Sequence, residues 1–338
     1  MQPFSINEQV RLIFPPNGYA FDTHTKEQQD FILDVKTVGI TEALCRLDAI
    51  QNERELSYPA VLKLEWSGKN NVFLLELSET PDFSSPKVFE CSENFFLLEN
   101  CKTNQTYYWR VNGSEIRTFT TKDGTRFLHI EGLRNVRDLG SKYIKQGYLF
   151  RGCEPAPSYT ITEKGKHTFC KDLNIKTQLD LRVEFYGQLD GSPCGQSVSL
   201  KQIPYRPYKD IIEEKHKIAI SKIIKFLSQE EHYPIYFHCK AGADRTGMIA
   251  FYIKTLLGEP DEDIFLDYEL TSLSRIPAND SNTVNGFRSI EHDYFVEFLD
   301  ILRSYAPNGN LREQVQTFLL DCGVKQEWID EIIRILKK

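Results

Sequence analysis

The chain has 338 residues, which at about 150 residues per domain predicts two domains rather than one compact core. Hydrophobic residues make up 41% and charged residues 26% of the chain, which excludes a disordered, collagenous or coiled-coil protein. With 41 Lys and Arg against 48 Asp and Glu, the net charge is −7. This charge opposes a broad nucleic-acid-binding surface and leaves room for a local basic pocket.

The sequence predicts a soluble protein without a membrane span. The apolar stretch Met248–Ile253 is far shorter than the roughly 20 residues that a span needs. Residues 1–15 carry no basic start followed by an apolar run, so we expect a cytoplasmic protein, or an exported one if a leader has been removed. Eight cysteines without a Cys-x-x-Cys pair indicate reduced thiols. No His, Asp and Glu grouping shows metal-ligand spacing, so we expect no metal and no cofactor.

The N-terminal part alternates short apolar runs with turn signals, as a small β-sandwich does. The predicted strands are Val61–Trp66, Val72–Leu77, Phe95–Leu98, Tyr107–Val111 and Phe119–Thr121. With Arg11–Gly18 as the opening strand and turn, they resemble a fibronectin type III module, in which a tryptophan fills the space between two sheets. We therefore predict such a module over residues 1–122, with a surface available for dimer formation or for a partner.

A helical insertion interrupts this module at about residues 21–57. Apolar side chains in Thr25–Val35 and Thr41–Glu53 recur at helical intervals. We expect two helices that pack on the sandwich.

Residues 123–338 predict an α/β domain with a central mixed, mostly parallel sheet flanked by helices, because β-like and longer helical segments alternate. The predicted strands are Gln178–Leu181 and Pro234–His238. The predicted helices are Lys215–Ser228, Arg245–Leu257, Asp261–Ser272, Tyr294–Tyr305, Leu311–Leu320 and Gln326–Leu336.

The segment from Ile235 to Gly247 indicates an anion site, because an apolar strand enters a loop that starts with Cys239, ends with Arg245 and leads directly into a helix. Loop N–H groups and the helix N-terminus can point at one anion there. Such a site favours a thiolate at Cys239. The planar fork of Arg245 can hold two phosphate oxygens, and the hydroxyl of Thr246 can donate to the sulfur.

This segment is the Cys-(X)5-Arg motif of tyrosine phosphatases, and it resembles the dual-specificity type. The resemblance implies a phosphocysteine intermediate, no metal, and a phosphorylated protein or phosphorylated small molecule as substrate. It assigns phosphate binding to the loop residues Lys240, Ala241, Gly242, Ala243, Asp244 and Thr246, and a supporting role to His238. A structural cysteine before a helix and a rhodanese loop are the alternatives.

Further motifs resemble the bacterial tyrosine phosphatase family. They are Gly132–Gly140, Tyr148–Gly152, Leu179–Arg182 with Glu184, and Leu257–Tyr268. Many members carry a lysine where this chain has Ala243, whereas Lys240 follows the nucleophile as in some phosphoinositide phosphatases. A phosphoinositide or inositol phosphate is therefore the alternative to phosphotyrosine.

The reaction also needs a carboxyl group that protonates the leaving oxygen. The family usually supplies an Asp from a loop about 30 residues upstream, and Asp210 lies 29 residues before Cys239. We predict Asp210 as the acid, with Asp180 as the main rival and Asp244 as the third choice. For Asp180, a role in holding Arg182 or Arg137 is favoured over catalysis.

Other hypotheses remain. Arg137 and Asp138 are predicted to form a buried ion pair at the sheet edge. A protein of another class would be a non-catalytic module that captures phosphorylated partners. A redox-sensing thiol protein would need Cys153 or Cys194 to lie near Cys239.

Overall fold

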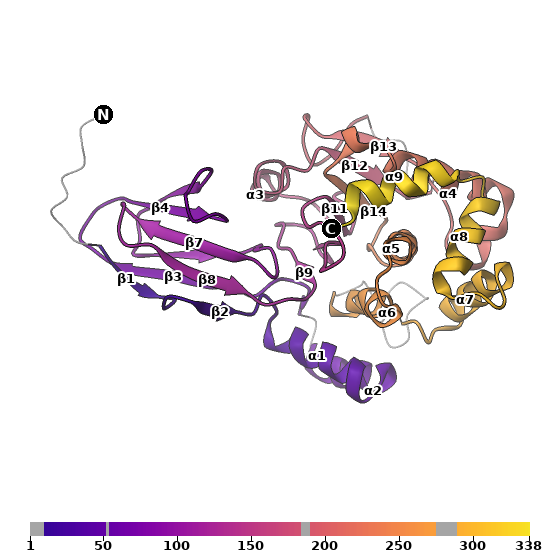
Figure 1. Cartoon of the computed structure of the whole chain (residues 1–338), viewed down its shortest axis with the longest axis horizontal. Coiled ribbons are helices and arrows are strands. Elements are labelled where there is room, and N and C mark those ends of the chain that lie inside the picture. Colours follow the sequence, from indigo (N-terminus) through magenta and orange to yellow (C-terminus); the bar gives the residue numbers. More distant parts are fainter. Residues whose placement is uncertain (1–9, 52–53, 184–189, 275–288) are drawn as a thin grey trace. The chain divides into compact units, whose positions relative to one another are not determined.

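The computed structural model describes residues 10–51, 54–183, 190–274 and 289–338. Glu184 lies outside these residues. The chain forms two compact units (Figure 1). The first comprises Met1–Thr25 and Pro59–Arg126, and the second comprises Lys26–Tyr58 and Phe127–Lys338.

The first unit consists of two sheets. Its strands are β1 (Arg11–Phe14), β2 (Tyr19–Phe21), β3 (Leu62–Ser67), β4 (Phe73–Ser78), β5 (Lys87–Cys91), β6 (Phe95–Leu98), β7 (Thr106–Val111) and β8 (Arg117–Thr121). One sheet has the order β1-β3-β6 and the other has the order β2-β8-β7-β4-β5. The pairing is antiparallel except between β2 and β8.

The two sheets share one apolar core, to which alternate residues of each strand contribute. In β3, Leu64 and Trp66 are buried while Lys63 is exposed, as a strand with one covered face requires. Trp66 meets Trp109 of the other sheet in the same core cluster. The predicted strands are found within a few residues, whereas β2 and β5 are missing from the prediction because one is very short and the other is mostly exposed.

The inserted segment differs from the prediction in its packing. Its helices α1 (Lys26–Thr37) and α2 (Ile40–Gln51) form as expected, but they belong to the second unit and not to the sandwich. Their apolar faces share a core with Phe127 and with Leu270 in the 3₁₀ turn Leu270–Leu273. The prediction identified the apolar stripe of each helix but not its partner, which follows about 220 residues later in the chain.

The second unit is built on a six-stranded mixed sheet of order β13-β12-β14-β11-β10-β9. Its strands are β9 (Arg126–Phe127), β10 (Arg137–Asp138), β11 (Leu149–Gly152), β12 (Thr177–Asp180), β13 (Ser199–Gln202) and β14 (Ile235–His238). The strands β11, β12 and β13 run parallel to their neighbours around β14, and β10 is antiparallel to β11. This arrangement agrees with the predicted mixed α/β domain.

Helices complete the second unit. They are α3 (Glu163–His167), a π-helical turn (Thr168–Asp172), a 3₁₀ turn η3 (Tyr208–Ile212), α4 (Glu214–Leu227), a 3₁₀ turn (Glu230–His232), α5 (Asp244–Leu257), α6 (Asp261–Glu269), α7 (Asp293–Tyr305), α8 (Leu311–Asp321) and α9 (Gln326–Leu336). From Thr246 to Leu257, every residue of α5 is buried, which makes α5 the central helix of the main core.

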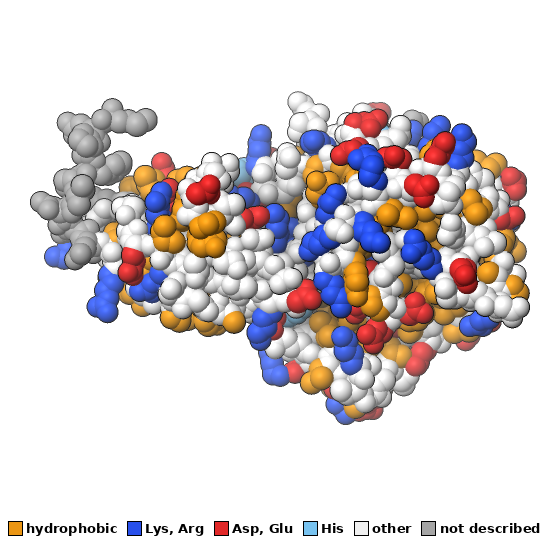
Figure 2. Space-filling view, viewed as in Figure 1, with side chains coloured by type: hydrophobic (Ala, Val, Ile, Leu, Met, Phe, Trp, Pro, Cys, Tyr) orange, Lys and Arg blue, Asp and Glu red, His pale blue; other side chains and the backbone are white. Residues whose placement is uncertain are grey.

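On the surface of the second unit, basic and acidic side chains are mixed. Figure 2 shows Lys and Arg side chains over the region where Figure 1 labels β11, β14 and the C-terminus, although the chain carries a net charge of −7. Among the described helices, none has the length and apolar character needed to cross a membrane.

Candidate active site

The loop from Cys239 to Ala243 joins the central strand β14 to the N-terminus of α5. Cys239 is 2% exposed, whereas the Lys240 side chain is exposed at the surface. Gly242 has φ of +71°, a left-handed conformation that side chains other than glycine disfavour. An added Cβ at Gly242 would lie 2.4 Å from the carbonyl group of Gly152, so this position requires glycine for both reasons.

The carbonyl groups of this loop point outward, into the protein. The bonds are from the Glu154 amide to Lys240 O at 2.9 Å, from Asn135 Nδ2 to Ala241 O at 3.0 Å, and from Arg151 Nη2 to Gly242 O at 2.7 Å. In a planar trans peptide, the N–H of the next residue points away from the carbonyl oxygen. The N–H groups of residues 241–243 are therefore directed toward the inside of the loop. Such a ring of donors at a helix N-terminus binds an oxyanion.

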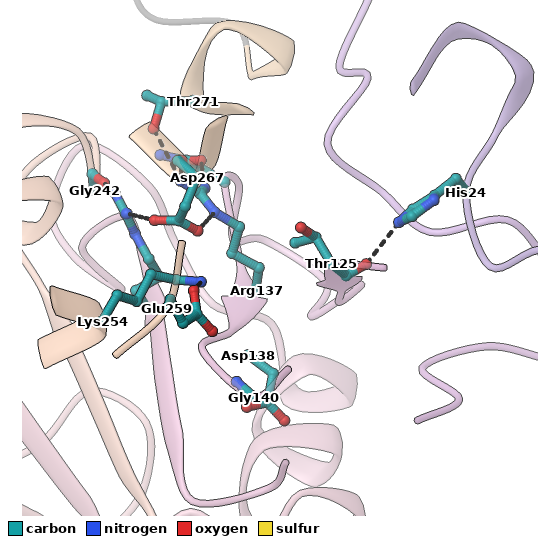
Figure 3. A network of polar contacts seen from close by, with 12 residues as sticks. His24, Thr125, Arg137, Asp138, Gly140, Gly242, Lys254, Glu259, Asp267 and Thr271 are labelled. Carbon is teal, nitrogen blue, oxygen red and sulfur yellow. Dashed lines mark hydrogen bonds and ion pairs between the residues drawn. The ribbon is translucent and has the colours of Figure 1, made fainter. Parts of the chain in front are cut away.

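A single buried carboxylate organises two of these contacts. Asp267 of α6 lies 3.0 Å from Arg137 Nε and 2.5 Å from Arg151 Nη1 (Figure 3). Arg151 then bonds Gly242, and Arg137 bonds the side-chain oxygen of Asn135. Burial alone would raise the pKa of Asp267, but the charges of Arg137 and Arg151 outweigh it and hold the pKa well below its usual range. The loop is thus anchored to a charged cluster inside the protein.

The predicted ion pair between Arg137 and Asp138 is wrong. These residues are neighbours in β10, and successive side chains of a strand point to opposite faces. Asp138 accepts hydrogen bonds from the amides of Gly140 and Gly147 instead, at 2.8 and 2.6 Å. The partner of Arg137, Asp267, lies 130 residues further along the chain, which sequence reasoning has no means of finding.

His238 is buried below the loop and fixes its first carbonyl group. Its Nδ1 lies 3.0 Å from the carbonyl oxygen of Cys239, and its Nε2 lies 2.8 Å from the side-chain nitrogen of Gln178. Because the carbonyl can only accept, Nδ1 carries the proton and Nε2 accepts. Burial lowers the pKa of His238, which agrees with this neutral ring.

The first turn of α5 presents two polar groups without partners. Nη1 of Arg245 and the hydroxyl of Thr246 are buried and make no hydrogen bond to any described residue. The predicted bond from Thr246 to the sulfur is therefore not formed in this structure. The hydroxyl of Tyr205 donates to the backbone carbonyl of Arg245 at 2.5 Å and fixes this turn. Unpaired buried donors are costly, and an oxyanion in the loop would satisfy them.

Asp180 is fully buried at the end of β12 and holds Arg182. The Nη2 and Nε atoms of Arg182 lie 2.7 and 2.9 Å from the Asp180 carboxylate, and Glu154 binds the same guanidinium at 2.5 Å. Burial opposes the charge of Asp180, but the hydrogen bonds from Arg182 outweigh it and lower the pKa. A carboxylate held in this way is a poor proton donor, which agrees with the structural role favoured from the sequence.

Asp210 lies in the 3₁₀ turn η3, ahead of α4, and is partly exposed. Two residues earlier, the hydroxyl of Tyr208 bonds to Asp244 in the first turn of α5 and lies 2.6 Å from the hydroxyl of Tyr268. The segment that carries Asp210 is therefore tied to the phosphate-binding loop. Asp244 has its carboxylate engaged in this contact.

The inserted segment reaches the loop through a chain of hydrogen bonds that the sequence did not indicate. Asn135, which holds Ala241, donates its backbone amide to the hydroxyl of Ser57 at 3.0 Å, and Ser57 donates to Glu55 at 2.5 Å. Residues 55–58 thus support the loop from the side of the insertion.

The eight cysteines are all free thiols. Burial raises the pKa of Cys153, and it raises the pKa of Cys194 to about 12, so both thiols stay protonated. This does not favour the redox-sensing hypothesis.

The arrangement defines a class of site in which a buried cysteine, inward-facing amides and an unpaired arginine surround one oxyanion. The chain belongs to the tyrosine phosphatase family, whose model matches residues 128–336. The family acts on phosphorylated substrates through a cysteine nucleophile.

Two solved structures resemble the chain more distantly, and no curated protein matches it. The core catalytic domain of the PP-IP phosphatase SIW14 from S. cerevisiae is 18% identical, with 44% of this chain and 83% of that chain covered and a TM-score of 0.33. TpbA from P. aeruginosa is 15% identical, with 56% and 91% covered and a TM-score of 0.33.

Proposed function

We propose that the chain hydrolyses phosphate monoesters through a phosphocysteine at Cys239, with phosphotyrosine proteins or peptides as its substrates. The observation that carries this proposal is the loop itself. Its carbonyl groups are bound from outside, so its amides converge on one point, and Arg245 offers an unpaired buried donor there.

The reaction follows from these groups. The sulfur of Cys239 attacks phosphorus, the bond to the leaving oxygen breaks, and Asp210 protonates that oxygen. The loop amides and Arg245 stabilise the negative charge on the remaining phosphate oxygens. Water then attacks the phosphocysteine while Asp210 takes up a proton, and the S–P bond breaks to release phosphate. The tie between Tyr208 and Asp244 supports Asp210 as the acid, because it holds the Asp210 segment beside the loop.

A phosphoinositide or an inositol phosphate is the second candidate substrate. Lys240 follows the nucleophile, and its side chain is exposed rather than folded into the protein. A cation at this position can bind an additional phosphate group of the substrate. A substrate panel that pairs phosphopeptides with inositol phosphates decides between the two candidates.

For the first unit we propose a fibronectin type III-like module spanning the strands of residues 1–122, which acts in dimer formation or in binding a partner. Its two sheets around a shared tryptophan-containing core support this assignment. We also retain the cytoplasm as the proposed compartment, since a reactive thiolate lasts longest under reducing conditions.

The decisive experiment is para-nitrophenyl phosphate hydrolysis in EDTA and reductant, over a range of pH. Cys239→Ser should abolish turnover, and Asp210→Asn should lower kcat about 10²- to 10⁴-fold and flatten the decline of the rate toward high pH. Cys45→Ser and Asp48→Asn are exposed controls on α2 that should behave like the unmodified chain. No hydrolysis of any panel member would reject the enzyme and favour a module that only captures phosphorylated partners.

A further inference from the structure

We propose that Asp210, Glu213 and His216 form a binding site for a divalent transition-metal cation such as Zn²⁺, which inhibits the enzyme by occupying Asp210. Among the described residues, one oxygen of each carboxylate and one ring nitrogen of His216 lie within 4.8 Å of one another. The inhibitory part rests on the proposed role of Asp210 as the acid. The binding part does not.

The histidine is the observation that distinguishes this group from an ordinary cluster of acidic side chains. His216 is 7% exposed, and its Nε2 is buried without a hydrogen-bond partner. This nitrogen lies 3.9 Å from Oε2 of Glu213, so it is aimed at the carboxylates. A buried ring nitrogen facing two carboxylates matches the ligand types that zinc takes in proteins.

The distances suit a cation after a small adjustment. Ligand atoms about 2.1 Å from one cation lie at most ~4.2 Å apart. Nε2 and Oε2 of Glu213 already meet this limit at 3.9 Å. The side chains of Asp210 and Glu213 are 27% and 47% exposed, so they can rotate toward the cation, and water can complete its coordination.

Binding has two identifiable costs. Lys215 Nζ lies 2.8 Å from Glu213 and Arg206 Nη1 lies 3.8 Å from Asp210, and both cations would have to move away. The ring proton of His216 must also move from Nε2 to Nδ1. This move gives up the hydrogen bond that Nδ1 accepts from the Arg206 amide, which at 3.3 Å is already longer than usual. We therefore expect reversible binding, as in a regulatory site.

The consequence for catalysis is direct. A carboxylate oxygen that ligates a cation cannot carry the proton that the leaving group needs. Zinc bound here would lower kcat in the same way as Asp210→Asn does, whereas the phosphate-binding loop would stay intact.

The first test measures Zn²⁺ binding by competition with a fluorescent chelator. It uses Cys239→Ser throughout, so that the nucleophilic thiol cannot bind the metal. One zinc ion per chain should bind, and Glu213→Gln and His216→Gln should each weaken binding at least tenfold. Glu214→Gln and His232→Gln are matched controls outside the cluster and should retain it. Because Glu213 is half exposed, its variant reports even if the buried His216 variant does not fold.

The second test measures para-nitrophenyl phosphate turnover with Cys239 present, at buffered free Zn²⁺, with each variant compared with its own zinc-free rate. Inhibition should be reversed by chelator, and Glu213→Gln should need at least tenfold more zinc. Absence of zinc binding in Cys239→Ser, or binding that persists in both cluster variants, would overturn the site. Binding without loss of turnover would overturn the inhibition. Failure of the proposed function itself would show as absent turnover before any zinc is added.

Discussion

Arg151 donates from Nη2 to the carbonyl oxygen of Gly242 at 2.7 Å, and this bond links the phosphate-binding loop to the buried carboxylate of Asp267. A fully buried arginine is thereby used to orient a backbone carbonyl group. The amide that follows this carbonyl is turned toward the substrate side of the loop.

Asp267→Asn should destabilise the protein and slow the enzyme together. It leaves Arg137 and Arg151 buried without their charged partner, which costs about 3–5 kcal/mol. Urea unfolding at pH 7 measures this loss, and kcat/KM for para-nitrophenyl phosphate should fall as the loop relaxes. Asp261→Asn, an exposed change in the same helix, should cost less than about 1 kcal/mol. Equal stability of the two variants would contradict the role of the cluster.

The same carboxylate gives a defined acid sensitivity. Because the folded-state pKa of Asp267 is depressed, its stabilisation is fully present above the unfolded pKa of about 3.9 and is lost as pH falls below it. Unfolding free energies between pH 3 and pH 7 should therefore decline more steeply in the unmodified chain than in Asp267→Asn. Parallel profiles would contradict the lowered pKa.

Gly242→Ala should abolish oxyanion binding by the loop. The added Cβ meets the Gly152 carbonyl group at 2.4 Å, and the residue keeps an unfavourable φ of +71°. Displacing even one oxyanion donor costs about 10²- to 10³-fold in kcat. Thermal stabilisation by tungstate should vanish along with turnover. Gly147→Ala, at φ of +86° with nothing within 4 Å, isolates the conformational cost and should retain tungstate binding.

Ser57→Ala tests the link from the insertion to the loop. It removes the acceptor of the Asn135 amide, and one such bond is worth about 0.5–1.5 kcal/mol. If that loss is felt in the transition state, kcat falls about 2- to 12-fold with KM nearly unchanged. Steady-state kinetics measures this effect, with Ser228→Ala at the end of α4 as the control. A rise in KM alone would point to substrate binding instead.

Glu269 should make stability decline toward alkaline pH. Burial raises its pKa to about 8, while its Oε1 accepts a bond from the Ile290 amide at 2.6 Å. A raised carboxyl pKa means that the folded state holds the extra proton. Its favourable contribution is full below about pH 4 and is lost as pH rises to about 8, by at most about 1.4 kcal/mol per pH unit.

Glu269→Gln keeps the acceptor without the charge, so it should flatten this decline and stabilise the protein at pH 8. Urea unfolding at pH 5, 6.5 and 8 measures the difference. Glu262→Gln, exposed on the same helix, should leave the profile unchanged. A Glu269→Gln profile as steep as that of the unmodified chain would refute the raised pKa.

The sequence by itself determined the features that depend on neighbouring residues. Strand, cysteine, glycine-containing loop, arginine and helix follow one another within Ile235–Leu257, and their chemistry can be inferred from that order alone. The α/β character of the second unit and the periodic helices were predictable for the same reason, since periodicity is a local property.

Only the tertiary structure decided which distant groups meet. Asp267 is the partner of Arg137 across 130 residues, and α1 and α2 pack in the second unit rather than on the sandwich. Asp210, Glu213 and His216 lie close in sequence, yet whether their ligand atoms converge depends on how η3 leads into α4. Such pairings are set by burial and by the closing of long loops, and a local pattern carries no information about them.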